Sequence, residues 1–341
     1  MRILLKGINF YINSPSLLVI LLILIPLLCF VPLLLYYRFS RFGKKVDFSV
    51  CSPEEGDRPG PSEWEKQMLD LAESHSQVRL TGYSFVLNDY NQAAYKKLNK
   101  IRNRISAVPS DMISLIPAAR WLFDNFQMLY REIKKVPSSG TGYAVLPILK
   151  GKEYHNFPRI YIVAKKMVAL SGGHLSEENI SVMLKAYQQK IALTDKEIWV
   201  LPEMLGFCLL EEIIVIADEI LHIIDVKSKA EKFLRDKLAD RQGPADIAAL
   251  LCEIEDDLRL NCSFHAHVIY MLKNMSFDEA SIQRYLKYHF VSQGRQMKSS
   301  GIFLEEGKIE SFLETNIRTF IVSLRDINEV DQEKFFQEYS C

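Results

Sequence analysis

The chain contains none of the short motifs that mark the commonest nucleotide, hydrolase and metal sites. Its 341 residues include no G-x-x-x-x-G-K-[ST] loop, no G-x-S-x-G elbow, no H-E-x-x-H pair and no C-x-x-C pair. Ser139-Gly-Thr-Gly142 holds a lone G-x-G without a third glycine or a preceding strand, so it predicts no dinucleotide loop. D-x-D, with which metal-dependent enzymes that use nucleotide sugars commonly hold the diphosphate, is also absent. We therefore expect no catalytic residue and no cofactor.

An excess of charge of one sign is missing as well. Lys and Arg together number 42, and so do Asp and Glu. A balanced chain has no global field that would attract nucleic acid, so we expect no nucleic-acid partner. The six cysteines are scattered, which agrees with a reducing cytosolic setting and indicates no disulfide framework.

What the sequence does contain is a long apolar run, Leu17–Tyr37, interrupted only by two prolines. A helix of that length spans about 31 Å, which matches the hydrocarbon core of a bilayer. A secretory signal peptide has a shorter apolar segment of roughly 7–15 residues and ends in a small-residue cleavage site, which is not found here. The run predicts a transmembrane helix over about 16–37 within a membrane anchor at 1–45. A buried core helix is the alternative.

The flanks of the run predict its orientation. Only Arg2 and Lys6 precede it, whereas four basic residues follow it directly: Arg38, Arg41, Lys44 and Lys45. Basic residues near a span are retained on the cytoplasmic side. We therefore expect a single-pass protein of the cell membrane, with the lipid bilayer as a partner and the rest of the chain in the cytoplasm.

Beyond the anchor, the segment 46–61 is rich in Pro and Gly and predicts a linker. The remaining residues, 62–341, are numerous enough for a substantial core or for two subdomains, 62–226 and 227–341. Capping-box signatures predict three helix starts in this part: Ser62 with Glu65, Thr194 with Glu197, and Ser276 with Glu279.

Apolar residues recur at helical spacing in two long stripes. The first runs from Ile198 to Ile220 and contains Pro202, which predicts a kink or a new helix start. The second runs from Ile309 to Ile327. Further helices are predicted over 85–106, 111–135, 157–170 and 177–190, and a long loop over Pro137–Pro158. Because no segment alternates convincingly as a strand does, the predicted fold class is all-α.

Two groups of residues are weak candidates for metal binding. Glu219 and His222 have the Glu-x-x-His spacing of di-metal bundles, and Glu212 lies one heptad earlier, although such a site needs a second pair and further glutamates. A solvated polar face is the alternative. The second group, Cys262, His265 and His267, has the side chains of zinc ligands but no second cluster near in sequence, so helix surface or packing is the alternative.

A basic segment and an aromatic segment also stand out. The basic one lies next to Tyr95, and it predicts either attraction to anionic lipid or a solvated face paired with acids: Lys96, Lys97, Lys100, Arg102 and Arg104. The aromatic one predicts core packing rather than a sugar-stacking platform: Trp121, Phe123, Phe126 and Tyr130.

Several stretches, taken in order, resemble the amino-terminal region of cyclic β-1,2-glucan synthase-like proteins, which are very large bacterial membrane enzymes. Together they cover most of residues 65–340. The stretches are Leu87-Asn-Asp-Tyr-Asn-Gln-Ala-Ala-Tyr95, Ala118-Ala-Arg-Trp-Leu-Phe-Asp-Asn-Phe126, Phe157-Pro-Arg-Ile-Tyr161, Leu175-Ser-Glu-Glu-Asn179, Ala186-Tyr-Gln188, Leu193-Thr-Asp-Lys-Glu-Ile-Trp-Val-Leu-Pro202, Ser323-Leu-Arg325 and Phe335-Phe336.

The resemblance implies a role in glucan synthesis from UDP-glucose at the inner membrane. In that family this region precedes the catalytic glycosyltransferase, which uses a divalent metal. Because D-x-D and Q-x-x-R-W are absent here, no catalytic residue of the family is carried over. The resemblance therefore implies a truncated, split or fragmentary member, a non-catalytic helical leader that scaffolds a missing or separate glucan-synthesising partner.

Two other functions stay open at this point. One is an independent membrane-anchored helical scaffold with an unrelated protein partner, and the other is a carboxylate-bridged metal oxidase using Glu212, Glu219 and His222. A leader that lacks its catalytic continuation should expose an apolar patch, and the stripe over 309–327 is the predicted patch.

Overall fold

The structure is a computed structural model, and it describes residues 60–77, 80–82, 87–135, 146–150, 157–238, 247–291 and 298–340. The predicted anchor at 1–45 and nearly all of the predicted linker lie outside these residues. The chain divides into two units, Met1–Cys51 and Ser52–Cys341, and everything described below belongs to the second. Among the described residues, no helix has the length and apolar character needed to cross a membrane.

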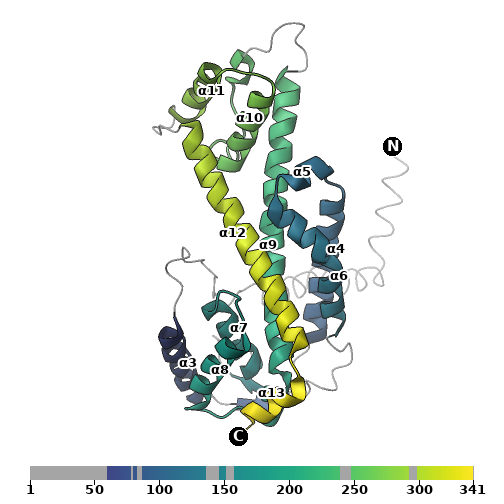
Figure 1. Ribbon diagram of the computed structural model, residues 1–341, viewed down its shortest axis with the longest axis vertical. Coiled ribbons are helices and arrows are strands. Elements are labelled where there is room, and N and C mark those ends of the chain that lie inside the picture. Colours follow the sequence, from purple (N-terminus) through teal and green to yellow (C-terminus); the bar gives the residue numbers. More distant parts are fainter. Residues whose placement is uncertain are drawn as a thin grey trace, which may run out of the picture. The chain divides into compact units, whose positions relative to one another are not determined.

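The described part is mainly helical, which confirms the all-α prediction (Figure 1). Its elements, in chain order, are α3 (Pro61–Ser76), β1 (Leu80–Gly82), α4 (Leu87–Ser106), α5 (Ser110–Ser114), α6 (Pro117–Lys135), β2 (Pro147–Leu149), α7 (Arg159–Leu170), α8 (Glu177–Gln188), α9 (Asp195–Leu238), the 3₁₀ turn η1 (Ile247–Leu250), α10 (Cys262–Asn274), α11 (Glu279–Leu286), the π-helical turn η2 (Lys287–Val291), α12 (Ser299–Glu329) and α13 (Gln332–Tyr339).

Helix α9, 44 residues long, is the element on which the others pack. It contacts α4, α6, α7, α10, α12 and α13, and α12 runs beside it in Figure 1. The predicted stripe explains this position, because its residues from Ile198 to Ile220 are buried. Helices α10 and α11 lie at one end of the α9–α12 pair, and α3, α7, α8 and α13 lie toward the other (Figure 1).

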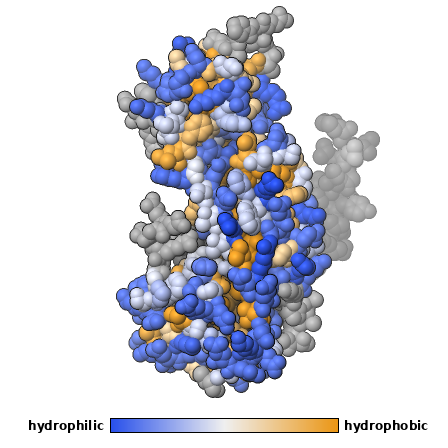
Figure 2. Space-filling model, in the orientation of Figure 1, coloured by the Kyte–Doolittle hydropathy of each residue, from blue (hydrophilic) through white to orange (hydrophobic). Residues whose placement is uncertain are grey.

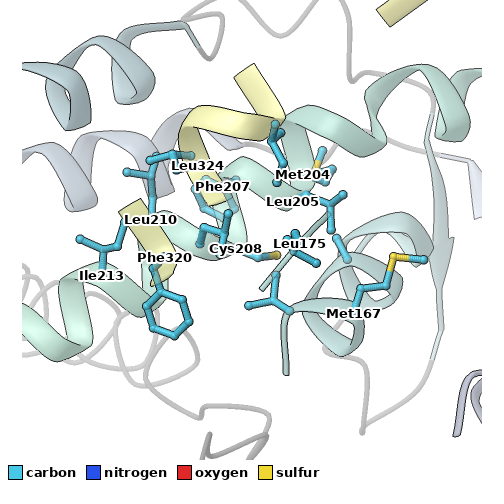
Figure 3. Packing of buried hydrophobic residues seen from close by; sticks show 14 of the residues in the cluster. Met167, Leu175, Met204, Leu205, Phe207, Cys208, Leu210, Ile213, Phe320 and Leu324 are labelled. Atoms are coloured by element: carbon cyan, nitrogen blue, oxygen red, sulfur yellow. The ribbon is translucent and has the colours of Figure 1, made fainter. Parts of the chain in front are cut away.

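The buried apolar side chains form two clusters. The larger joins α3–α8 to most of α9 and to the last part of α12, and Figure 3 shows its centre around Phe207, Cys208 and Phe320. The smaller begins at Val226 of α9 and takes in α10, α11 and Ile302 of α12. The final residues of the chain therefore pack with the cluster of the first half. The division into two subdomains at 226/227 stays a prediction.

The predicted exposed patch over 309–327 is mostly wrong. Ile309 and Phe312 are each 41% exposed, but the rest of that apolar stripe, from Leu313 to Ile327, is buried. The last part of α12 packs against α6 and α9, so its apolar side is already covered within the fold.

Helix bounds follow the prediction closely for α4, α7 and α8. The predicted helix over 111–135 is divided, because α5 ends at Ser114 and α6 begins at Pro117. A proline is favourable at the first helical position but disfavours helical geometry in the residue before it. Of the two alternatives predicted at Pro202, the new helix start is wrong, since α9 continues through that residue, and the kink stays a prediction. Pro202 is buried, so packing offsets the lost hydrogen bond.

One of the three predicted capping boxes is confirmed. Oε2 of Glu197 accepts hydrogen bonds from the backbone N–H and the Oγ1 of Thr194, both at 2.9 Å, and the N–H of Glu197 donates to Thr194 Oγ1 at 3.4 Å. The box at Ser62 is wrong, because α3 begins one residue earlier, at Pro61, the last residue of the predicted linker. Gly60 is its N-cap, without a side-chain cap.

The box at Ser276 is wrong for a different reason. Ser276 has a φ of 64° and ends α10 in a Schellman motif, in which the N–H of Phe277 donates to the carbonyl of Leu272 at 3.0 Å. The cap of α11 is Asp278, whose Oδ1 accepts from the N–H of Ser281 at 2.9 Å. Ser276 thus ends α10, and Asp278 begins α11.

A small antiparallel sheet was not predicted. β1 pairs with β2 in the register Leu80↔Leu149, so part of the predicted loop over Pro137–Pro158 is a strand. Each strand has three residues. A segment that short shows no alternation that sequence reading could detect.

Candidate functional site

A buried ion pair joins the start of α7 to the start of α9. Arg159 Nε donates to Glu197 Oε1 at 2.8 Å, and Arg159 Nη2 donates to Glu197 Oε2. Arg159 is 3% exposed and Glu197 is fully buried. The same carboxylate caps α9 through Thr194, so one glutamate closes a helix end and binds a neighbouring helix.

The electrostatics of the pair favour the charged form of Arg159. Burial by itself would lower the pKa of Arg159, but the hydrogen bonds and the charge of Glu197 outweigh burial and raise that pKa. The guanidinium also acts on His75 in α3. Burial first, and then the charge of Arg159, lower the pKa of His75 to about 4. Nδ1 of His75 lies 2.7 Å from the hydroxyl of Tyr187 in α8, which ties α3 to this centre.

A second polar cluster lies where α7 faces the middle of α9. Nζ of Lys165 lies 2.9 Å from Oε2 of Glu211 and 2.7 Å from Oε1 of Glu212. The Tyr161 hydroxyl donates to Glu211 at 3.0 Å. Burial would lower the pKa of Lys165, but the neighbouring carboxylates raise it, so the ammonium stays charged. The thiol of Cys208 beside it is fully buried, and burial raises its pKa well above the usual value, so it is no reactive thiolate.

The structure does not bring the three metal candidates together. Glu212 is ion-paired with Lys165, whereas Glu219 and His222 are exposed farther along α9. Seven residues of helix separate Glu212 from Glu219 by about 10 Å along the axis. Within the described residues, no group of three or more His, Cys, Asp or Glu side chains could hold a metal ion.

The second candidate group, Cys262, His265 and His267, is likewise dispersed. Both ring nitrogens of His265 are occupied, Nδ1 by the Tyr285 hydroxyl at 2.8 Å and Nε2 by the Arg259 carbonyl at 2.9 Å. His267 instead faces Glu231, with Nε2 3.3 Å from Oε1. His265 is thus a packed, hydrogen-bonded core histidine. Its partners, Tyr285 and Arg259, lie outside the Cys262–His267 motif, so the motif could not predict them.

The basic segment of α4 is partly paired with acids of α9, as one of the two alternatives predicts. Lys97 Nζ lies 2.5 Å from Asp218 Oδ2, and Arg104 is ion-paired with Asp225. Arg102 instead lies over the Tyr130 ring, 5.7 Å from its centroid.

Core packing is confirmed for part of the predicted aromatic segment in α6. Phe126 and Tyr130 are buried, whereas Phe123 is 45% exposed. Trp121 is half-buried, and Arg318 of α12 lies over its ring at 5.6 Å.

Several of the stretches that carry the family resemblance are hydrogen-bonded to one another. Arg159 and Glu197 come from two of them. Arg325 Nη2 donates to Asn125 Oδ1, which joins two more, and the N–H of Leu175 donates to Ser323 Oγ at 3.1 Å. Each of these hydrogen bonds joins two helices, or a helix and a turn. These stretches therefore include residues that form polar contacts between distant parts of the fold, and the sequence alone did not predict these contacts.

The buried histidines predict a destabilisation of the protein in mild acid. The pKa of His75 and that of His265 are each lowered by burial from 6.5 to about 4. Between pH 6.5 and 4 the unfolded chain binds protons that the folded chain does not, so the free energy of unfolding falls as the pH falls through this window. Each histidine contributes a slope of up to about 1.4 kcal/mol per pH unit.

Urea unfolding of the full chain in detergent at a series of pH values measures this slope. A His265→Gln variant should show a flatter dependence, because one of the differential protons is removed. The matched variant His222→Gln changes an exposed histidine and controls for the substitution itself. If the slope of His265→Gln equals that of the wild type, buried His265 is not a source of the destabilisation in acid.

Comparison with known proteins gives one relationship. No protein-family model matches the chain. The chain is similar to "Cyclic beta-(1,2)-glucan synthase NdvB" of Rhizobium meliloti (strain 1021), with 24% identity over 272 residues. The match covers 79% of this chain but 9% of the relative's length. It supports a distant relationship to a cyclic β-glucan synthase.

Proposed function

We propose that this chain is a membrane-tethered, non-catalytic helical module of a cyclic β-glucan synthase-like system. It acts beside a catalytic part that makes glucan from UDP-glucose, carried on a separate chain or in a continuation of this one. Its role is to hold that part near the cytoplasmic side of the membrane.

The observation that carries this proposal is the extent of the match. Similarity runs over 79% of this chain and falls on 9% of a protein whose name states glucan synthesis. Because the matched segment is so small a share of the relative, the catalytic domains of that protein can lie outside it. In the described part of this chain, the charged groups with internal partners hold helices together, as Arg159 with Glu197 and Lys165 with Glu212 do.

The membrane tether in the proposal rests on the apolar run Leu17–Tyr37 and on the four basic residues that follow it. Alkaline extraction of membranes tests it, because peripheral proteins are released and spanning proteins are not. We expect the full chain to stay with the lipid.

Copurification tests the partnership. The full chain, tagged at its C-terminus, is isolated from membranes of its own host after mild detergent extraction. We expect a glucosyltransferase to copurify and the complex to incorporate labelled glucose from UDP-glucose. A matched preparation from a chain that carries only residues 1–60 before the tag controls for partners held by the membrane segment alone.

Two outcomes would contradict the proposal. If the bound protein is unrelated to glucan synthesis, the chain is an independent scaffold. If stoichiometric iron or manganese accompanies the purified chain and is lost in a Glu212→Gln variant, the chain is a metal protein.

A further inference from the structure

One face of α4 carries basic, amide and aromatic side chains over an open depression of about 550 Å³. All of the lining residues come from α4 and the turn that follows it: Tyr95, Lys96, Asn99, Lys100, Asn103, Arg104 and Ala107. None of them is acidic. They form two adjacent rows with a spacing of four residues, which places them on one side of the helix.

The charge on this face is only partly compensated. Lys97 and Arg104, at its edge toward α9, are ion-paired with Asp218 and Asp225. Lys96 and Lys100 are exposed, and no ion pair of either lysine is found among the described residues. Where Figure 1 places α4 and α6, Figure 2 shows a mainly hydrophilic surface with some hydrophobic residues.

The form of the depression indicates what could occupy it. A small-molecule site typically encloses 70–90% of its ligand's surface, between several elements. A depression lined by a single helix cannot do so, but it can lie against an extended surface. Tyr95, 37% exposed, has a ring and a hydroxyl suited to a membrane interface, and lysine stems can lie along apolar surface while their ammonium groups reach headgroups.

We propose that this face of α4 binds the anionic phospholipid surface of the membrane to which the chain is tethered. The inference rests on the tether of the proposed function. Residues 38–60, if fully extended, would reach at most about 80 Å. Each lysine at an anionic surface raises the binding constant by about fivefold. Lys96 and Lys100 together should therefore raise it by about 30-fold at low salt. Glu219, exposed nearby on α9, opposes part of this attraction.

Lysine acetylation rates, measured by mass spectrometry, test the contact in the full chain. The chain is placed in nanodiscs of phosphatidylcholine alone or with phosphatidylglycerol. With the anionic lipid, we expect acetylation of Lys96 and Lys100 to slow by about fivefold or more and to recover at high salt. Lys190, after α8, and Lys196, at the start of α9, are exposed outside α4, serve as controls and should keep their rates.

A matched pair of variants gives a second measurement. Anionic lipid should slow hydrogen exchange of the α4 amides in the wild type and in Lys190→Gln/Lys196→Gln. In Lys96→Gln/Lys100→Gln that slowing should be lost. A loss in both double variants would indicate an effect of total charge and would overturn the proposal.

The remaining outcomes are also decisive. Unchanged rates at Lys96 and Lys100, in a chain that stays with the nanodisc, overturn this inference and leave the tether intact. A chain that never enters the nanodisc fraction refutes the tether itself. Slowing by inorganic phosphate in neutral nanodiscs would show a site for a soluble anion and would overturn binding to a lipid surface.

Discussion

Replacing Glu197 with Gln should lower the free energy of unfolding by about 3–5 kcal/mol, because it leaves the buried guanidinium of Arg159 without a counter-charge. The side chain keeps its size, and its amide oxygen can still accept from Thr194, so the helix cap is largely preserved. The loss therefore reports the ion pair rather than a cavity. Urea unfolding of the full chain in detergent, followed by far-UV circular dichroism, measures it.

A double-mutant cycle separates the pair from its surroundings. Arg159→Met together with Glu197→Gln removes both charges, so the double variant should be more stable than Glu197→Gln alone. Asp257→Asn, which changes an exposed ion pair with Lys229, is the matched control and should leave the unfolding midpoint near that of the wild type. Equal losses for Glu197→Gln and Asp257→Asn would contradict the account.

Replacing Gly173 with Ala should cost about 2–5 kcal/mol. Gly173 has a φ of +79°, a left-handed conformation that costs about 1–2 kcal/mol for a residue with a Cβ. An added Cβ would lie 1.9 Å from Cε1 of Phe320, whose ring is buried and cannot move away freely. Overpacking of this kind typically costs about 1–3 kcal/mol.

Two other glycines supply matched controls for this substitution. A Cβ at Gly206 in α9 would meet Leu324 at an ordinary 3.5 Å, and a Cβ at Gly307 in α12 would meet open space. Alanine in a helix interior is favoured over glycine, so both variants should be more stable by about 0.5–1 kcal/mol. Thermal unfolding of the three proteins gives the comparison. A Gly173→Ala variant as stable as the controls would contradict the packing of the turn against α12.

Local signals predicted the local structure well. The apolar stripe from Ile198 predicted the buried face of α9, and the box of Thr194 with Glu197 predicted the start of that helix. Such features depend on residues within one or two turns of each other. Ser276 shows the limit, since its local signature is that of a helix start, whereas in the structure it ends α10.

Contacts between distant residues could not be predicted. Arg159 and Glu197 are 38 residues apart, and nothing in either stretch identifies the other as its partner. The stripe over 309–327 likewise showed that α12 has an apolar side, but not that α6 and α9 cover it. The spacing of Glu212, Glu219 and His222 left a metal site open, whereas Lys165 of α7 takes Glu212 as its ion-pair partner.

The most direct test of the account is a single assay, the incorporation of labelled glucose from UDP-glucose into glucan. It is applied to the purified full chain in nanodiscs and to host membranes with and without the chain. We expect no incorporation by the chain alone, and incorporation by membranes that falls when the chain is deleted and returns when it is restored. Glucan made by the purified chain alone, or membranes that are equally active without it, would contradict the account.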